Sequence, residues 1–379
     1  MVSQIASFRH ERNLGLLLLL WFCLCGLSCS PPEPLQLGFV GGLSGRVADL
    51  GLAGRDAVQL AVDLRNQAGG VAGRQVSLVF RDDRQDPDQA RLAVRELLDQ
   101  DVAAIIGPMT SDMAVAVVPL LNQAHMVGVS PTVTTEALTG QDDFFLRVTA
   151  TTKVFASANA AYQLKHGRMR RVAAAYDRGN RSFSELWLQN FATALAQGGG
   201  EVVAKVPFTS GEQVVYRSLA GRLLASRPDG VLLVANSMDS ALLCQQIRKL
   251  DAKLPITLAD WGANERLLEL GGKAVEGVSV VQPFNRYGQE PRYQEFRRQY
   301  LDRFSREPGF AGVHGFEAAN LVMDALAHAA GGPALKAAIL ANMPYPGLQG
   351  PLHLDQFGDV PRSPLSMSVI RDSRFVVVD

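Results

Sequence analysis

The sequence predicts an α/β protein built from two doubly wound parallel-sheet lobes. From residue 37 to residue 329, short apolar runs alternate with amphipathic segments, which is typical of parallel strands joined by covering helices. The strands are too numerous for one open sheet of ordinary size. The length of 379 residues also exceeds one typical domain of roughly 150 residues.

The elements of the first half follow from apolar spacing. Short apolar runs predict strands, and apolar positions three and four apart predict helices. Gly69 and Gly70 end the first helix, and a Gly107–Pro108 break separates the third strand from the third helix. The predicted strands are 37–40, 76–80, 102–106 and 126–129, and the predicted helices are 52–67, 86–98 and 111–124.

The second half repeats this alternation and ends in β-rich runs. Extended segments at 147–149 and 280–282 predict that the chain crosses between lobes more than once. We therefore expect one lobe from 37–148 and 283–340, and the other from 149–282 and 341–379. The predicted strands are 171–176, 201–206, 230–235, 256–259, 277–281, 366–370 and 374–378, and the predicted helices are 153–165, 184–196, 213–226, 239–250, 291–306 and 314–329.

The N-terminus has the pattern of a secretory signal. A short basic segment precedes an apolar run over 14–24, which is too short to span a bilayer. The residues that follow resemble a bacterial lipobox, in which cleavage leaves a lipidated cysteine. We expect a signal peptide at 1–28 and a lipid on Cys29; the alternative is a plain secreted protein with an odd cysteine.

Charge and cysteine content narrow the function classes. The 37 basic residues balance the 37 acidic ones, which argues against a nucleic-acid binder. Loss of residues 1–28 would leave 35 basic and 36 acidic residues, which gives a net charge of −1. Cys23 and Cys25 leave with the signal, and Cys244, in an apolar stretch, is expected to be a buried thiol.

Catalytic and metal-binding patterns are missing from the sequence. It contains no GxSxG, HExxH or GxxxxGK[ST]. His314 and His328 lack a carboxylate pair at ligand spacing, so we expect neither a metal nor a cofactor. An enzyme is therefore the weakest of the function classes.

The candidate site lies in the loops that follow the strands, where ligands of open α/β sheets bind. Ser111 is expected to be a helix N-cap, and a compatible further role is to hold a ligand carboxylate together with the free N–H groups of the helix N-terminus. Thr132 and Thr134 are either turn hydroxyls or further donors. Asp260 either caps the following helix or pairs with a ligand ammonium, and Trp261 either stacks on the ligand or fills the lobe interface.

Several of these loops resemble the leucine/isoleucine/valine-binding protein family, the type I periplasmic solute-binding proteins of branched-chain amino acid ABC transporters. The resemblance covers about 35–358. The segments that carry it are LGFVGGLSGRVADLGL at 37–52, NQAGGVAGR at 66–74, FRDDRQDPDQA at 80–90, IIGPMTS at 105–111, VSPTVTTEALT at 129–139 and EG at 276–277.

The resemblance implies two lobes joined by three crossovers that close on a ligand by hinge motion. Ser111, Thr132 and Thr134 match the carboxylate-binding positions, and Asp260 matches the acid that pairs with the ammonium. Three further positions that are often aromatic in the family match Leu50, Asn236 and Phe183. Asp260 is shorter than the usual Glu, and Leu50 and Asn236 are not aromatic, so the ligand is amino-acid-like without being fixed as branched-chain.

The sequence therefore predicts a lipid-anchored solute-binding protein that delivers its ligand to an ABC permease. Its location is the periplasm or the cell surface. The alternatives are a sensory receptor on the same fold and an envelope lipoprotein that activates a cell-wall enzyme by contact.

Overall fold

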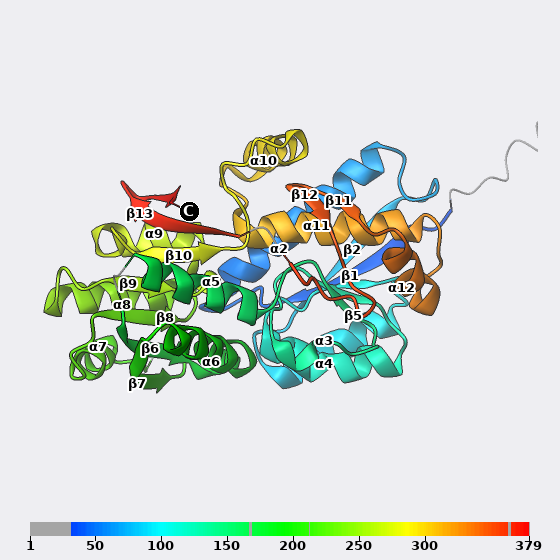
Figure 1. The fold of residues 1–379 in the computed structure, drawn as a ribbon. Helices are drawn as coiled ribbons and strands as arrows, with labels where there is room; N and C mark the ends of the chain where they lie inside the picture. The colour runs from blue at the N-terminus through cyan, green and yellow to red at the C-terminus, as the bar shows by residue number, and fades with distance from the viewer. Residues whose placement is uncertain (1–31, 167–168, 212, 363–364, 379) are drawn as a thin grey trace, which may run out of the picture.

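The computed structural model describes residues 32–166, 169–211, 213–362 and 365–378, which form two α/β lobes (Figure 1). Each lobe is a sheet covered by helices on both faces, as the sequence predicts. The predicted signal peptide and Cys29 lie outside the described residues.

The first lobe contains a parallel sheet of five strands in the order β2-β1-β3-β4-β5. Successive side chains of a strand point to opposite faces. Phe39 and Ile106 accordingly pack toward α2 and α11, while Val40 and Ile105 pack toward α3 and α4. The strands are β1 (Leu35–Gly41), β2 (Val76–Asp82), β3 (Ile105–Ile106), β4 (Gly128–Ser130) and β5 (Phe145–Arg147).

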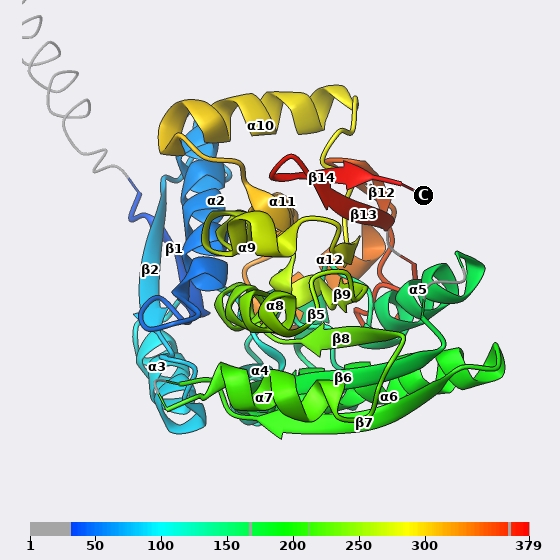
Figure 2. The ribbon, with the colours of Figure 1, turned by 90° about the vertical axis from the view of Figure 1, so that its left-hand side faces the viewer.

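The helices of this lobe come from both halves of the chain. The described helix α11 begins at Gly309, five residues before the predicted start, and α12 was not predicted from the sequence. α10 lies on the outside, at the top of Figures 1 and 2. The helices are α2 (Ala48–Gln67), α3 (Pro87–Asp99), α4 (Ser111–Gln123), η1 (Glu136–Leu138), α10 (Pro291–Phe304), α11 (Gly309–Leu326) and α12 (Gly332–Ala341).

The second lobe has a seven-stranded sheet in the order β14-β13-β10-β9-β8-β6-β7. Five strands are parallel, as predicted, but β13 is antiparallel to β10, and β14 is antiparallel to β13. Asp372 and Ser373 both have positive φ, which suits the tight turn of a two-residue hairpin. The strands are β6 (Arg171–Asp177), β7 (Glu201–Phe208), β8 (Gly230–Val234), β9 (Ile256–Leu258), β10 (Ser279–Gln282), β13 (Ser366–Arg371) and β14 (Arg374–Val377).

Helices cover both faces of the second sheet, and Figure 2 turns this lobe toward the viewer. Val172 and Leu232 pack with α5 and α6, whereas Ala173 and Leu233 pack with α7, α8 and α9. The helices are α5 (Thr152–Lys165), η2 (Arg178–Asn180), α6 (Arg181–Gln197), α7 (Tyr216–Leu224), α8 (Ser237–Leu250), η3 (Asp260–Gly262), α9 (Glu265–Gly271) and η4 (Gly272–Val275).

The chain passes between the lobes three times: after β5, after β10 and after the hairpin of β11 (Tyr345–Gly347) and β12 (Gly350–Leu352). The predicted boundary at residue 341 differs from this arrangement, because that hairpin is bonded to the first lobe. Tyr345 donates to Asp324 of α11 at 2.8 Å, and the Leu348 N–H donates to Glu317 of α11 at 2.7 Å. Of the described residues after 341, those of β13 and β14 join the second sheet.

Candidate functional site

A small cavity lies between the lobes, at the carboxyl ends of their strands. Its volume is about 10 Å³, which is room for roughly one water molecule. We call it the inner cavity. It is lined by Leu50, Met109, Thr110, Ser111, Thr132, Asn180, Phe183, Asp260, Trp261 and Phe310.

The inner cavity brings together six of the eight ligand-binding residues predicted from the sequence. They are Leu50, Ser111, Thr132, Phe183, Asp260 and Trp261. Asn236 does not line this cavity: it is the N-cap of α8, where its Oδ1 accepts from the Asp239 N–H at 2.9 Å. Thr134 is also outside the lining, and its buried Oγ1 has no hydrogen-bond partner among the described residues.

Ser111 lies at the N-terminus of α4. The N-cap is Thr110 rather than Ser111, so the N-cap interpretation of Ser111 is wrong. Ser111 is the first helical residue, and the residue is 2% exposed. Because the first turn of a helix has free N–H groups and the positive end of the dipole, this end of α4 favours an anion.

Thr132 is held in place by the loop after β4. Its hydroxyl donates to the Met109 carbonyl at 2.5 Å, while Ser130 Oγ accepts from the Thr132 and Val133 N–H groups. The Thr132 oxygen can still accept a hydrogen bond. Thr132 therefore both stabilises the turn and lines the inner cavity.

Asp260 is the acidic group of the inner cavity. It follows β9 at the start of η3, and its residue is 4% exposed. Burial raises the pKa of Asp260 to about 6, and a hydrogen bond from Trp187 Nε1 to its Oδ1, 2.8 Å long, works in the opposite direction. Trp187 thus fixes one carboxylate oxygen and favours the ionised form.

Aromatic and aliphatic side chains form the rest of the wall. Phe183 of α6 and Trp261 of η3 pack edge to face, with ring centroids 5.6 Å apart. Leu50 of α2 and Phe310 of α11 contribute from the first lobe, each 4% exposed. An ion pair inside such an apolar wall is screened less by solvent than one at the surface.

The N-termini of α4 and α6 cap each other across the interface. The Asp112 N–H donates to Asn180 Oδ1 at 3.0 Å, and the Asp112 carboxylate accepts from the Arg181 and Ser182 N–H groups at 2.9 and 2.7 Å. Asp112 belongs to the first lobe, and the other three residues belong to the second. All three bonds cross from one lobe to the other, so a separation of the lobes would break them.

A second group of contacts closes the interface beside α2. The Asp49 carboxylate accepts from Ser237 Oγ and from Asn264 Nδ2, both on the second lobe. Arg46 reaches Asp239 at 3.3 Å and the Tyr216 hydroxyl at 2.8 Å. Gly51 allows the loop after β1 to approach α2, because a Cβ there would lie 2.0 Å from the Gly42 carbonyl oxygen.

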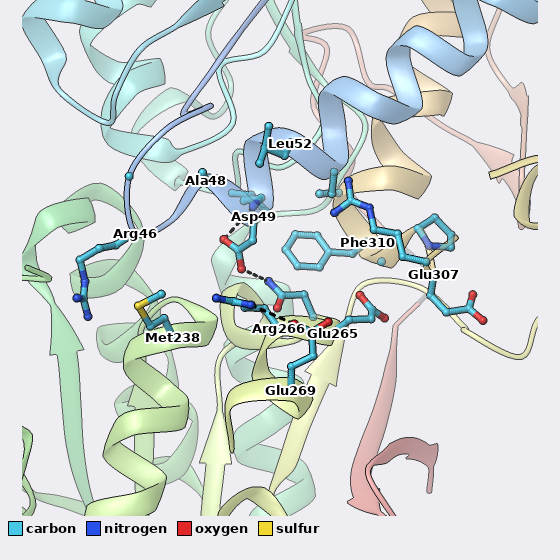
Figure 3. Close-up of a pocket in the computed structure, with 18 residues that line it drawn as sticks. Arg46, Ala48, Asp49, Leu52, Met238, Glu265, Arg266, Glu269, Glu307 and Phe310 are labelled. Atoms are coloured by element: carbon cyan, nitrogen blue, oxygen red, sulfur yellow. Dashed lines mark hydrogen bonds and ion pairs between the residues drawn. The ribbon is translucent and has the colours of Figure 1, made fainter. Parts of the chain in front are cut away.

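A larger cavity of about 350 Å³ adjoins the inner cavity (Figure 3). We call it the outer compartment. It shares Leu50 and Phe310 with the inner cavity. Its lining residues are Gly45, Arg46, Ala48, Asp49, Leu50, Leu52, Ala53, Met238, Asn264, Glu265, Arg266, Glu269, Arg306, Glu307, Pro308, Gly309, Phe310 and Ala311.

Comparison with known proteins identifies the family. The profile described as "Periplasmic binding protein" matches residues 34–367. The chain belongs to the periplasmic binding protein family. The expectation drawn from the loop motifs is thereby confirmed.

Relatives and solved structures agree with this assignment. The chain is 28% identical to the Leu/Ile/Val-binding protein BraC3 of Rhizobium johnstonii, over 64% of this chain and 66% of that protein. It is 25% identical to the Leu/Ile/Val-binding protein of Escherichia coli K12, over 86% of this chain and 88% of that protein. The fold is that of a leucine binding protein from Thermotoga maritima, with a TM-score of 0.84, 22% identity and coverage of 91% and 98%.

Several residues of the site in this periplasmic binding protein were not predicted from the sequence. Asn180 and Asp49 lie in loops that follow predicted strands, but no motif marks either residue. Trp187 lies four residues after Phe183 on the same helix face, and that spacing is the signal that points to it. Phe310 had no local signal, because α11 was predicted to begin after it.

The described residues show no group of three metal-ligating side chains. Within the same residues, no helix is both long and apolar enough to cross a bilayer. Cys244 is confirmed as a buried thiol, and burial raises its pKa to about 12. It therefore stays protonated and unreactive at neutral pH.

Proposed function

We propose that this periplasmic binding protein captures an amino-acid-like solute between its lobes and delivers it to the permease of an ABC transporter. The observation that carries the proposal is the inner cavity, where the N-terminus of α4 from one lobe meets the Asp260 carboxylate from the other. A zwitterion matches both groups, because an anion favours the helix end and an ammonium favours the carboxylate.

In this proposal each lining residue has a separate role. Ser111 and Thr132 bind the ligand carboxylate, whereas Thr134, which lies outside the cavity lining, is given no contact with the ligand. Asp260 pairs with the ammonium. Phe183, Trp261 and Leu50 shape the space for the side chain, and closure excludes water from these contacts. No bond of the solute is broken.

A thermal-shift screen tests the function. The mature protein is heated with amino acids, small carboxylates and small amides in turn. A ligand far above its Kd stabilises the folded state by a few kcal/mol, about 2.7 kcal/mol at one hundred times Kd. A screen in which no amino acid or related compound raises the melting temperature would refute the proposal.

Asp260 variants test the site. Asp260→Ala is expected to abolish the amino-acid shift and leave the unliganded protein folded, since the side chain bonds only to Trp187 and to its own backbone N–H among the described residues. Asp302→Asn, at an exposed acid on α10, is the matched control and should retain the full shift. An undiminished shift in Asp260→Ala would remove Asp260 from its assigned role.

We also propose that Cys29 carries a lipid that anchors the protein to a membrane. The support is the apolar run at 14–24 and the small residues before Cys29. Mass spectrometry of the mature N-terminus should show a diacylglyceryl-modified Cys29. An unmodified Cys29, or cleavage at another position, would contradict the anchor.

A further inference from the structure

The two cavities of the cleft differ greatly in size. The inner cavity measures about 10 Å³ and the outer compartment about 350 Å³. Only the larger value falls in the range of ligand pockets, which is roughly 300–1,000 Å³. Leu50 and Phe310 line both cavities, so a ligand that extends beyond its head group passes between these two side chains.

Asp49 is the unneutralised charge of the outer compartment. Its carboxylate accepts from Ser237 Oγ, Asn264 Nδ2 at 2.9 Å and the Leu50 N–H at 2.9 Å, all of them neutral donors. Within the described part of the chain, no cationic side chain forms an ion pair with it. A carboxylate accepts about four hydrogen bonds, so one position on Asp49 stays open.

The other charges around the outer compartment are already compensated. This leaves Asp49 as the group that a charged ligand would meet unpaired. The ion pairs are Arg46 with Asp239, Arg266 with Glu269, Arg306 with Asp56, Glu265 with Arg286 and Glu307 with Arg297.

We propose that the preferred solute is an α-amino acid with a long cationic side chain, whose guanidinium or ammonium group reaches Asp49 in the outer compartment. The proposal rests on the proposed function, because the head group is placed among the residues of the inner cavity, whose volume of about 10 Å³ has to widen to admit it. Asp49 directly precedes Leu50 in α2. An apolar stem that packs on Leu50 and Phe310 therefore brings its charged end beside the Asp49 carboxylate.

A ligand cation bound at Asp49 would also stabilise the closed arrangement of the two lobes. Asp49 belongs to the first lobe and already bonds to Ser237 and Asn264 of the second. A cation held there lies at the seam between the lobes. Because Asp49 is half-buried, the pair is expected to exceed an exposed ion pair and to give about fivefold in affinity.

Titration calorimetry with L-arginine and L-citrulline tests the proposal. Citrulline has the shape of arginine and a neutral end, so the ratio of the two Kd values isolates the cation. We expect arginine to bind about fivefold or more tightly than citrulline, and more tightly than leucine. Asp49→Asn should bring the ratio close to one: both Kd values rise because the bonds to Ser237 and Asn264 weaken, and the arginine Kd rises about fivefold more than the citrulline Kd.

The matched control is Glu269→Gln. Glu269 lines the same compartment and is exposed, but it is already paired with Arg266 at 3.2 Å. This variant should keep the wild-type ratio. If Asp49→Asn weakens both ligands equally, Asp49 acts only on closure and the inference is overturned.

The remaining outcomes separate this inference from the proposed function. If leucine binds and arginine gains nothing over citrulline, the inference fails and the solute-binding function stands. If no amino acid binds, the function itself fails. If agmatine, which lacks the carboxylate, binds as tightly as arginine, the head-group assignment is wrong and the inference falls with it.

Discussion

Charged groups are used differently in two regions: at the hinge, where the crossing segments leave the first lobe beside β5, and at the mouth, where Asp112 and Arg46 of the first lobe contact the second. At the hinge, the Arg147 side chain is fully buried and bonds to Asp359 Oδ1, the Thr135 carbonyl and Thr139 Oγ1. At the mouth, contacts such as those of Asp112 and Arg46 involve side chains that are partly exposed. Both regions rely on charged groups, but in different solvent environments.

The difference follows from which contacts must break when the protein opens. Desolvating a charge is costly, and a buried pair that loses one partner is strongly destabilised. Arg147 and Asp359 both belong to the first lobe, so opening leaves them paired. Asp112 bonds across the cleft, and in the open form water replaces those bonds at low cost.

Asp359→Ala is expected to have the largest effect among the variants that test this comparison. The substitution leaves the buried Arg147 guanidinium unpaired and also removes the acceptor of the Gly140 N–H at 2.7 Å. We expect a loss of about 3–5 kcal/mol in the free energy of unfolding, measured by urea denaturation. Glu269→Ala, at an exposed pair, should cost less than about 0.5 kcal/mol. Equal losses would erase the distinction between the two environments.

Asp112→Ala tests the mouth. It removes the acceptor of two N–H groups at the start of α6, an effect of about 1–2 kcal/mol for a helix cap. Because these bonds cross between the lobes, the loss should appear in ligand affinity, as a Kd raised about five- to thirtyfold. The unfolding midpoint measured without ligand should change much less than the Kd if the lobes separate in the absence of ligand.

Asp88→Ala is the control for Asp112. Asp88 is an exposed acid of α3 on the same lobe and does not touch the second lobe. Its Kd should equal that of the wild type. A Kd unchanged in Asp112→Ala would mean that the reciprocal caps do not contribute to closure.

The sequence predicted the regions where the ligand chemistry lies, because strand ends and helix starts follow from local patterns. Ser111, Thr132 and Asp260 all lie just after buried strands, and the structure gathers them in one cavity. Local spacing also located most helices. The resemblance to a known family added the expected roles of these residues in ligand binding, which local spacing does not determine.

Long-range contacts were not predictable in the same way. Trp187 bonds to Asp260 across 73 positions, and Arg147 bonds to Asp359 across 212. Nothing near residue 341 shows that the following hairpin stays on the first lobe; the bonds of Tyr345 and Leu348 to α11 decide it. Asn236 fitted an aromatic position by alignment, whereas its side chain caps α8.

Trp187→Phe is expected to have the smallest effect. It tests whether the indole N–H of Trp187 helps to keep the buried Asp260 carboxylate ionised. Since burial raises the pKa of Asp260 to about 6, the carboxyl is ionised above that pH and neutral below it. Affinity for an ammonium-bearing ligand should therefore be constant above pH 6 and fall by up to about tenfold per pH unit below it. Removing the Trp187 donor disfavours the ionised form, so the midpoint should move upward by about one pH unit.

The control for this shift is Phe191→Leu. Phe191 stacks on Trp187 with centroids 5.8 Å apart and makes no hydrogen bond to Asp260, so its loss disturbs the same packing without touching the carboxylate. Both variants should lower the melting temperature. Only Trp187→Phe should move the pH midpoint of binding, and a shift of equal size in Phe191→Leu would show that packing, rather than the indole N–H, sets the ionisation of Asp260.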